Sequence, residues 1–266
     1  MLEIEFAQIS DTGPTRPHHE DCVGYVLPEN EEQARTHGWL FVVADGVGGH
    51  AQGEVASQAA VESLLAGFRG AAKGEALPTL LQRLVQGANT RVFEAALDAG
   101  PAGAGMSTTI VSCALRHDRV AVAHVGDSRC YLIRGGEARP LTRDHTVASE
   151  QAGLGILSSK EAAEAETRHL LSRSLGGELM VNVEVSNQQL YPGDLLLLCS
   201  DGLHGAVSTE QILEVVTQTP DVNAAVNRLA ELANQQDGAD NVSAQLVRVR
   251  NVERVGMYRG RPYKLR

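Results

Sequence analysis

An unbroken apolar run that ends at an acidic residue constrains the fold of this chain more than any other feature. Residues 39–44 (WLFVVA) are all apolar, Asp45 follows them, and three glycines lie within the next four residues. A run rich in aromatic and β-branched residues predicts a strand that is buried on both faces. Apolar residues at helical spacing over residues 52–68 predict a helix after the glycines. The core therefore ends at Asp45, and a turn leads into the helix.

Asp45 has two interpretations when this stretch is considered alone. A tight strand-to-helix turn explains an acid that is followed by glycines, and many folds need such a turn. The alternative is a metal ligand, because carboxylate and carbonyl oxygens suit Mg²⁺ or Mn²⁺. The turn is the simpler interpretation until the pattern recurs. It recurs where the apolar strand 195–199 is followed by Ser200, Asp201 and Gly202.

The rest of the chain predicts further strands and helices. Strands are predicted at 2–9, 22–27, 108–115, 120–125, 130–133, 138–141, 181–190 and 242–249, and helices at 77–97, 209–217 and 222–236. The first two strands suggest a hairpin with a long tip. The strands between 108 and 141 have connections too short for crossovers, which predicts an antiparallel meander. Residues 28–38 are predicted to be a charged connector, and residues 144–175 helices with a lid-like insertion.

Composition and charge narrow the class of protein. The chain has 266 residues, 43% of them hydrophobic and 21% charged, which suits one soluble globular domain. A formal net charge of -10 argues against nucleic acid as the main partner. Residues 248–266 carry seven Arg or Lys against the single acid Glu253. Such a segment could bind an acidic partner or a membrane surface, but we interpret it as a solvated basic tail.

No targeting or membrane-spanning segment is expected from the sequence. No stretch approaches the ~20 apolar residues that a spanning helix needs, and the N-terminus lacks the features of a signal peptide. The four cysteines are scattered through apolar runs without metal-knuckle spacing, so we expect buried free thiols in a reducing cytoplasm. We therefore expect a cytoplasmic protein.

Four aspartates stand at the ends of predicted strands: Asp45, Asp127, Asp201 and Asp240. If the strands lie side by side, these acids converge at one edge of the sheets. Buried carboxylates repel one another unless cations neutralise them. Hard oxygen donors without His or Cys partners indicate Mg²⁺ or Mn²⁺ and argue against zinc or copper.

Seven short motifs occur in order between Arg16 and Asn241. They lie at residues 16–21 (Arg, then Glu-Asp), 43–50 (VADGVGGH), 108–109 (TT), 126–129 (GDSR), 142–145 (TRDH), 200–203 (SDGL) and 240–241 (DN). Together they resemble the bacterial members of the metal-dependent protein phosphatase family (PPM, or type 2C). The resemblance implies an α+β fold, a four-layer α-β-β-α sandwich of two antiparallel sheets flanked by helices. We expect one catalytic domain over 1–250, with a flap at about 147–171 and the basic tail at 251–266.

The resemblance also implies a centre of two Mn²⁺ or Mg²⁺ ions, with a possible third. Asp45 would bridge the pair, the Gly46 carbonyl would bind the second ion, and Asp201 and Asp240 would hold the first. Asp127 with Asp201 matches a third, weaker site.

Three further residues complete the implied site. Glu20 and Asp21 would act through metal-bound waters. Arg16 would bind phosphate, because its planar guanidinium can donate to two phosphate oxygens at once. Arg16 with Asp45, Asp201 and Asp240 would form the catalytic set.

Three positions depart from the family pattern. His19 stands where many members have asparagine, and Ser107 replaces a common glycine. Val47 occupies the position of a histidine proposed as general acid in eukaryotic members, so a proton for the leaving group must come from metal-bound water or another residue. We assign that role to neither His145 nor His50.

These features lead to one leading hypothesis and two rivals. We expect an enzyme, a monomer, that hydrolyses phosphoserine and phosphothreonine in proteins with a metal-activated water and opposes a bacterial Ser/Thr kinase. A catalytically weak phosphoprotein-binding module of the same fold is the alternative. A nucleotide-binding α/β domain fits poorly, because the chain lacks the Walker lysine and the alternation of parallel strands with helices.

Overall fold

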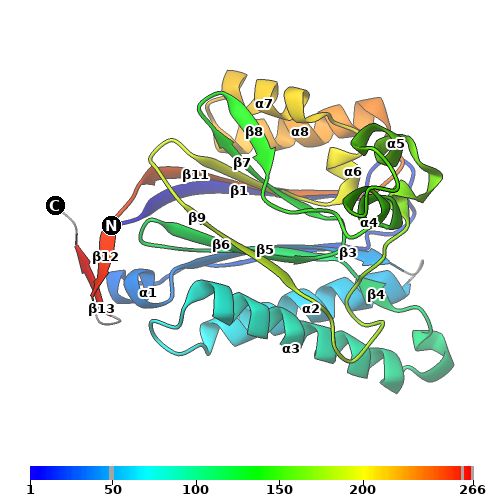
Figure 1. The fold of residues 1–266 in the computed structure, drawn as a ribbon, viewed down its shortest axis with the longest axis horizontal. Coiled ribbons are helices and arrows are strands. Elements are labelled where there is room, and N and C mark those ends of the chain that lie inside the picture. Colours follow the sequence, from blue (N-terminus) through cyan, green and yellow to red (C-terminus); the bar gives the residue numbers. More distant parts are fainter. Residues whose placement is uncertain (48–50, 259–260, 265–266) are drawn as a thin grey trace.

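Two antiparallel sheets stack face to face, and helices cover the outer face of each (Figure 1). The computed structural model describes residues 1–47, 51–258 and 261–264. Helices α2 (Ala51–Arg69) and α3 (Leu77–Asp98) cover one sheet, and α7 (Thr209–Gln218) and α8 (Val222–Gln236) cover the other. The predicted α-β-β-α sandwich is therefore confirmed.

The two sheets are built from strands that are far apart in the sequence. Within the described residues, the first sheet has the order β1 (Glu3–Asp11), β11 (Val242–Asn251), β10 (Leu195–Cys199), β7 (Arg129–Arg134) and β8 (Glu137–Pro140). The second has the order β2 (Asp21–Val26), β3 (Trp39–Val47), β5 (Ile110–Arg116), β6 (Arg119–Val125) and β9 (Glu184–Gln189), and the short β4 (Ser107–Thr108) pairs with the end of β3. The strands β3 and β10 thus lie inside their sheets, as their apolar sequences require.

Alternate residues of β3 face two different cores. Leu40, Val42 and Ala44 pack against helices α2 and α3, whereas Phe41 and Val43 pack between the sheets. All five are fully buried. The apolar strand β10 divides in the same way between the inter-sheet core and the layer under α7 and α8. Because a strand with helices on one side and a sheet on the other has no solvent face, it needs no polar position.

The predicted hairpin between the first two strands is wrong. Strand β1 pairs with β11 from Glu3 to Asp11, and β2 pairs with β3 from Asp21 to Val26, so the two lie in different sheets. The connection over residues 12–20 crosses from one sheet to the other. Alternation of apolar residues shows which face of a strand is buried, but the strand that pairs with it is decided by distant sequence.

The predicted meander also breaks once. The pairs β5–β6 and β7–β8 are antiparallel hairpins, as predicted. Strand β6, however, continues to β9 and β7 to β10, so the chain changes sheets between Val125 and Arg129. The turn at residues 126–128 is short enough for a hairpin, yet it joins the two layers of the sandwich.

Smaller elements complete the chain. The predicted connector contains helix α1 (Glu31–Thr36), whose N-cap Asn30 accepts a hydrogen bond from the Gln33 N–H, and that helix was missed. A short helix η1 (Gly100–Gly103) follows α3. The segment predicted to be a basic tail contains two paired strands, β12 (Val255–Tyr258) and β13 (Arg261–Lys264), which the sequence did not predict. The boundary at residue 250 stays a prediction.

The flap lies beside one end of the sandwich, away from β12 and β13 (Figure 1). It contains α4 (Val147–Gly153), α5 (Ser159–Glu164) and η2 (Glu166–His169), and α6 (Asp201–His204) lies next to it. All four cysteines are free, as predicted. Among the described helices, none combines the length and apolar composition that crossing a bilayer requires.

Candidate metal centre

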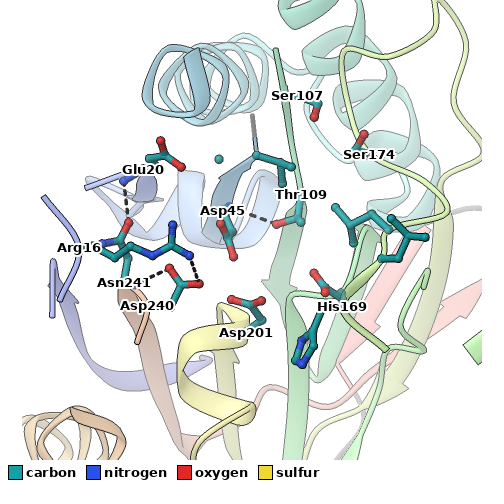
Figure 2. A pocket seen from close by; sticks show the side chains of 15 residues that line it. Arg16, Glu20, Asp45, Ser107, Thr109, His169, Ser174, Asp201, Asp240 and Asn241 are labelled. Carbon is teal, nitrogen blue, oxygen red and sulfur yellow. Dashed lines mark hydrogen bonds and ion pairs between the residues drawn. The ribbon is translucent and has the colours of Figure 1, made fainter. Parts of the chain in front are cut away.

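The main chain of Asp45 is held on both sides by a pair of threonines. The Thr108 hydroxyl and the Thr109 N–H both donate to the Asp45 carbonyl oxygen, each at 2.8 Å. The Asp45 N–H donates to the Thr109 hydroxyl at 3.1 Å. These bonds fix the end of β3 against the start of β5, and the Asp45 carboxylate points into the cavity (Figure 2).

Glycine at position 46 is required by the close approach of two segments. A Cβ at Gly46 would lie 2.2 Å from the Gly53 carbonyl oxygen and 2.7 Å from that of Glu20. The Gly46 N–H donates to the same Glu20 oxygen at 3.1 Å. The first turn of α2 and the loop before β2 therefore meet at the residue after Asp45, and Gly46 lines the cavity.

Asp21 and Asp201 reach the site from different sheets. Asp21 lies opposite Asp45 in the β2–β3 register, and its carboxylate accepts a hydrogen bond from the Ser200 hydroxyl at 2.8 Å. Asp201 is the first residue of α6, directly after β10. A Cβ at Gly202 would lie 2.0 Å from the Asn241 carbonyl oxygen, so only glycine allows α6 to approach this segment.

Asn241 holds the loop that carries Arg16 and Glu20. Its amide group donates to the carbonyl oxygens of Thr12 and His18 at 2.8 and 3.0 Å, and its oxygen accepts the Glu20 N–H at 2.8 Å. Asn241 is only 4% exposed, so these bonds are shielded from water. Sequence reasoning gave this residue no role, although it belongs to the last motif.

Arg16 forms an ion pair with Asp240 at the mouth of the cavity. The guanidinium donates to Asp240 at 2.7 Å (Figure 2). It also donates to the Ala239 carbonyl oxygen at 3.1 Å. Both side chains are partly exposed, at 45% and 37%. The guanidinium is thus placed at the open side of the cavity.

The Asp127 turn is fixed by two histidines. Gly126 has a φ of +103°, and it exchanges two hydrogen bonds with His145: the His145 N–H donates to the Gly126 carbonyl oxygen at 3.0 Å, and the Gly126 N–H donates to Nδ1 at 3.2 Å. The Asp127 carbonyl oxygen accepts from Nε2 of His204 at 2.9 Å. Burial lowers the pKa of His204 to about 4, which keeps it neutral. These bonds leave the Asp127 carboxylate to line the cavity.

The structure brings seven of the eight predicted site residues to one cavity of about 650 Å³: Arg16, Glu20, Asp45, Gly46, Asp127, Asp201 and Asp240. Asp21 is not among the lining residues, and its carboxylate accepts a hydrogen bond from the Ser200 hydroxyl. Sequence reasoning missed His169, Leu170, Leu171 and Ser174, which line the cavity from the flap side. No local pattern identifies them, because their position depends on how the flap folds.

The carboxylates in this cavity raise one another's proton affinity. Burial, followed by the negative charges of Asp21 and Asp201, raises the pKa of Asp45 well above its ordinary value. Burial and nearby acids also raise the pKa of Asp21 and of Asp127 to about 7. The pKa of Asp240 is raised as well, first by burial and then by Asp201. Such a cluster is stable near neutral pH only if protons or cations neutralise it.

The donor set fits divalent cations. The Asp201 Oδ1 atom is buried and has no hydrogen-bond partner among the described residues. A buried carboxylate oxygen normally has a partner, and its absence is expected where a cation is to be bound. Four aspartates, Glu20 and Gly46 offer oxygen donors to this cavity, and such a donor set favours Mg²⁺ or Mn²⁺.

A second group of potential ligands does not form a metal site. His124, His145 and Glu184 place one ligand atom each within 4.8 Å of one another. Nδ1 of His145 accepts the Gly126 N–H at 3.2 Å, and Nε2 lies 3.2 Å from Glu184 and 3.3 Å from Nη1 of Arg173. Both ring nitrogens of His145 therefore already have partners, which a metal ion at Nε2 would have to displace. This group is therefore a hydrogen-bonded support of the Asp127 turn.

The three departures from the family pattern have distinct surroundings. His19 contacts the Ser10 hydroxyl through Nε2 at 2.8 Å, and burial lowers its pKa. Val47 and Ser107 pair in the β3–β4 register, and both line the cavity. The cavity therefore has an apolar side chain at the position of the eukaryotic histidine. The side chain of His145 faces Gly126 and not the cavity. The motif residues 48–50, including His50, lie outside the described residues.

The chain was compared with known sequences. Residues 31–249 match the family model described as "Protein phosphatase 2C". The serine/threonine protein phosphatase PstP of Mycobacterium tuberculosis is 36% identical over 242 residues, which cover 91% of this chain but only 44% of that protein. The chain thus spans less than half the length of this relative. The serine/threonine phosphatase stp of Listeria innocua is 33% identical over 258 residues, covering 95% of this chain and 96% of that protein.

Solved structures show the same fold. The Streptococcus agalactiae serine/threonine phosphatase superposes with a TM-score of 0.84 at 30% identity, covering 93% of this chain and all of that one. The catalytic domain of PstP in complex with two manganese ions superposes with a TM-score of 0.80 at 34% identity, covering 94% and 100%. The predicted family is confirmed by these matches. The chain belongs to the protein phosphatase 2C family.

Proposed function

We propose that the protein is a Mn²⁺- or Mg²⁺-dependent phosphatase that hydrolyses phosphoserine and phosphothreonine in proteins. The observation that carries this proposal is the meeting of Asp45, Asp127, Asp201 and Asp240 around one cavity, although they lie far apart in the sequence. The relatives are named serine/threonine phosphatases, and a related catalytic domain holds two manganese ions, which supports the same chemistry here.

The acidic residues of the cavity and Gly46 each have a defined task in this proposal. Asp45 and the Gly46 carbonyl would hold one ion, and Asp201 and Asp240, with Asp45, the other. Asp127 with Asp201 would hold a weaker third ion. When bound, a pair of divalent cations lowers the pKa of a water between them and neutralises the phosphoryl oxygens.

The remaining residues position the substrate and the ligands. Arg16 lies at the mouth of the cavity, and its guanidinium fork would orient two phosphate oxygens. Glu20 and Asp21 would accept hydrogen bonds from waters at the metal centre. Arg16 pairs with Asp240, a carboxylate that would hold the first ion, at 2.7 Å, which supports a role next to the ions. We further propose that the enzyme opposes a Ser/Thr kinase, because phosphorylated proteins need a source.

Metal removal and one substitution test the proposal. We expect phosphate release from a phosphothreonine peptide with Mn²⁺ and none above background with EDTA. Asp45→Ala would lower turnover at least a thousandfold, because it removes the bridging carboxylate. Asp98→Ala, at an exposed position of α3, is the matched control and would leave turnover unchanged.

The outcomes separate the two functions considered above. Equal rates with Mn²⁺ and EDTA would defeat the metal-dependent mechanism. Peptide binding by a folded wild-type protein without any turnover would instead favour the regulatory module. Circular dichroism of Asp45→Ala would show that a loss of turnover does not come from a loss of fold.

A further inference from the structure

A second cavity of about 850 Å³ adjoins the candidate metal centre beneath the flap. The two cavities share four lining residues, Asp127, His169, Asp201 and Asp240. From these residues the second cavity extends between two walls. The flap forms one wall, and α6 and Asp237 form the other. A peptide whose phosphorylated residue enters the first cavity therefore has neighbouring side chains within reach of the second.

The flap wall of this cavity is built from small side chains. Ala148 and Ala152 lie one turn apart on α4, and Ala162 and Ala163 lie on α5, and all four line the cavity. Residues four apart lie on the same face of a helix. Alanine at these positions leaves room that larger side chains would fill, so the cavity is a consequence of the flap sequence.

Two exposed arginines, Arg143 and Arg168, line the same cavity. Neither forms an ion pair within 4 Å with any residue that the structure describes. Two arginines nearby are paired: Arg129 with Asp144 at 2.7 Å and Arg173 with Glu150 at 3.4 Å. The cavity thus presents cationic groups whose charge is not neutralised by a close partner.

The Arg143 guanidinium is held against the flap. Its Nη1 atom lies 3.0 Å from the place of a Cβ at Gly153, so the glycine makes room for it. The Arg143 carbonyl oxygen accepts from Nε2 of His124 at 2.9 Å, which anchors the main chain. Glu184 acts on Arg143 at longer range, but its carboxylate contacts His145 at 3.2 Å.

The charge balance of the cavity favours an anionic guest. Asp127, Asp201 and Asp240 are assigned to cations, and Asp144 to Arg129. The acid that remains on the wall is Asp237, against two arginines. The chain as a whole has a net charge of -10, which repels acidic ligands elsewhere on the surface.

We infer that this cavity is a subsite for an acidic side chain of the substrate, an aspartate, a glutamate or a second phosphorylated residue, near the residue that is dephosphorylated. The inference rests on the proposed phosphatase function and adds the sequence chemistry that the enzyme selects. Arg143 and Arg168 bind the anionic group, and the alanines of the flap accommodate its aliphatic part. A carboxylate is planar and a phosphate is tetrahedral. A guanidinium can bind two oxygen atoms of either group through two N–H groups.

A matched set of peptides tests the subsite. Phosphothreonine peptides would carry Glu, Gln or phosphoserine at single positions within three residues on either side of the phosphothreonine. With Mn²⁺, we expect kcat/KM to be about threefold to tenfold higher for Glu than for Gln at one or more positions, as expected for a partly exposed ion pair. Phosphoserine would give a larger gain because it carries more charge, and because it is itself a substrate, the loss of phosphate from the phosphothreonine is followed separately by tandem mass spectrometry.

Substitutions then assign the preference to this cavity. Arg143→Gln with Arg168→Gln would bring the Glu-to-Gln ratio close to one, whereas p-nitrophenyl phosphate, which is too small to reach the subsite, would be hydrolysed at the wild-type rate. Arg91→Gln, at an exposed position on α3, is the control and would keep the ratio. A wild-type ratio near one at every position, or a ratio that survives the double substitution, would overturn the inference.

The same assays separate this inference from the function on which it rests. Absence of Mn²⁺-dependent turnover of p-nitrophenyl phosphate by the wild type would defeat the phosphatase proposal itself. Turnover of that small substrate without any preference for acidic peptides would defeat the subsite alone.

Discussion

Several side chains of the motifs hold neighbouring parts of the site in position. Thr108 and Thr109 fix Asp45, Ser200 holds Asp21, and Asn241 binds three main-chain groups of the loop that carries Arg16. A metal centre built from carboxylates needs such supports, because the acids repel one another until cations are bound. The motif residues without a predicted role are therefore part of the site's construction.

Asn241 offers a direct test of this support. In Asn241→Ala the Glu20 N–H and the carbonyl oxygens of Thr12 and His18 lose their partners, so we expect the free energy of unfolding to fall by roughly 2–4 kcal/mol. The Mn²⁺ concentration for half-maximal activity would rise, because the loop that carries Glu20 is no longer held. Urea unfolding and a Mn²⁺ titration measure the two effects.

Asn227→Ala is the control for that substitution. Within the described part of the chain, the Asn227 side chain bonds only to Asn223 on the same helix α8, so its replacement would change the free energy of unfolding by less than about 0.5 kcal/mol. If Asn241→Ala were as mild as Asn227→Ala, the anchoring role would be wrong.

At the scale of elements, the sequence predicted the helices and buried strands well and their partners less well. The predicted helix at 222–236 has the bounds of α8, and the apolar runs that form β3 and β10 are buried as expected. Two predicted strand pairings are wrong, that of β1 with β2 and that of β6 with β7. In both cases the chain crosses from one sheet to the other between the two strands. A strand pattern encodes buried faces, whereas a partner strand is chosen by the whole fold.

The candidate site was more predictable than the topology. Seven of eight predicted residues line one cavity, since the motifs mark strand ends that the sandwich brings to the same edge. Two residues on the flap side of the cavity, His169 in η2 and Ser174 just beyond the flap, could not be predicted. The short helix and the loop that carry them have no hydrophobic period.

The contact between β3 and α2 gives a prediction at this scale. Gly46→Ala would place a methyl group 2.2 Å from the Gly53 carbonyl oxygen, so α2 must shift from the end of β3. We expect a lower melting temperature and at least tenfold lower Mn²⁺-dependent turnover.

Gly87→Ala is the matched substitution on α3. A Cβ there meets nothing within 4 Å, and the position is helical and exposed. Alanine should therefore raise the free energy of unfolding by about 0.5–1 kcal/mol and leave turnover unchanged. Equal behaviour of the two variants in thermal melts and assays would contradict the close-packing argument at Gly46.

For the whole molecule, the acidic cavity couples stability to pH. Burial and nearby acids raise the pKa of Asp21 and of Asp127 to about 7 in the folded chain, above their ordinary value of 3.8. The folded state then binds these protons more tightly than the unfolded state. The resulting stabilisation is fully present below about pH 4 and is lost as the pH rises through about 7.

This linkage predicts that the melting temperature without metal falls as the pH rises, whereas the increase in melting temperature caused by Mn²⁺ becomes larger. In EDTA, the contribution of these groups would lower the melting temperature between pH 5.5 and pH 8. Mn²⁺ would raise the melting temperature more at pH 8 than at pH 5.5, because its ligands must be deprotonated. Differential scanning fluorimetry across this range measures both trends.

Asp127→Asn isolates one group, because an amide does not titrate. In EDTA at pH 8 this variant would be more stable than the wild type, and its pH slope would be smaller. A wild-type slope in the variant would show that Asp127 does not contribute to the linkage.

Strand β3 also carries the only tryptophan of the chain, whose fluorescence can be measured. Trp39, the chain's single tryptophan, begins β3 and is 8% exposed in the inter-sheet core, while Asp45 lies six residues further along the same strand, roughly 20 Å away. Its fluorescence emission would therefore change when the two sheets separate on unfolding. It would not change when ions bind at the other end of β3. Intrinsic fluorescence can thus follow unfolding in every titration above without interference from occupancy of the acidic centre.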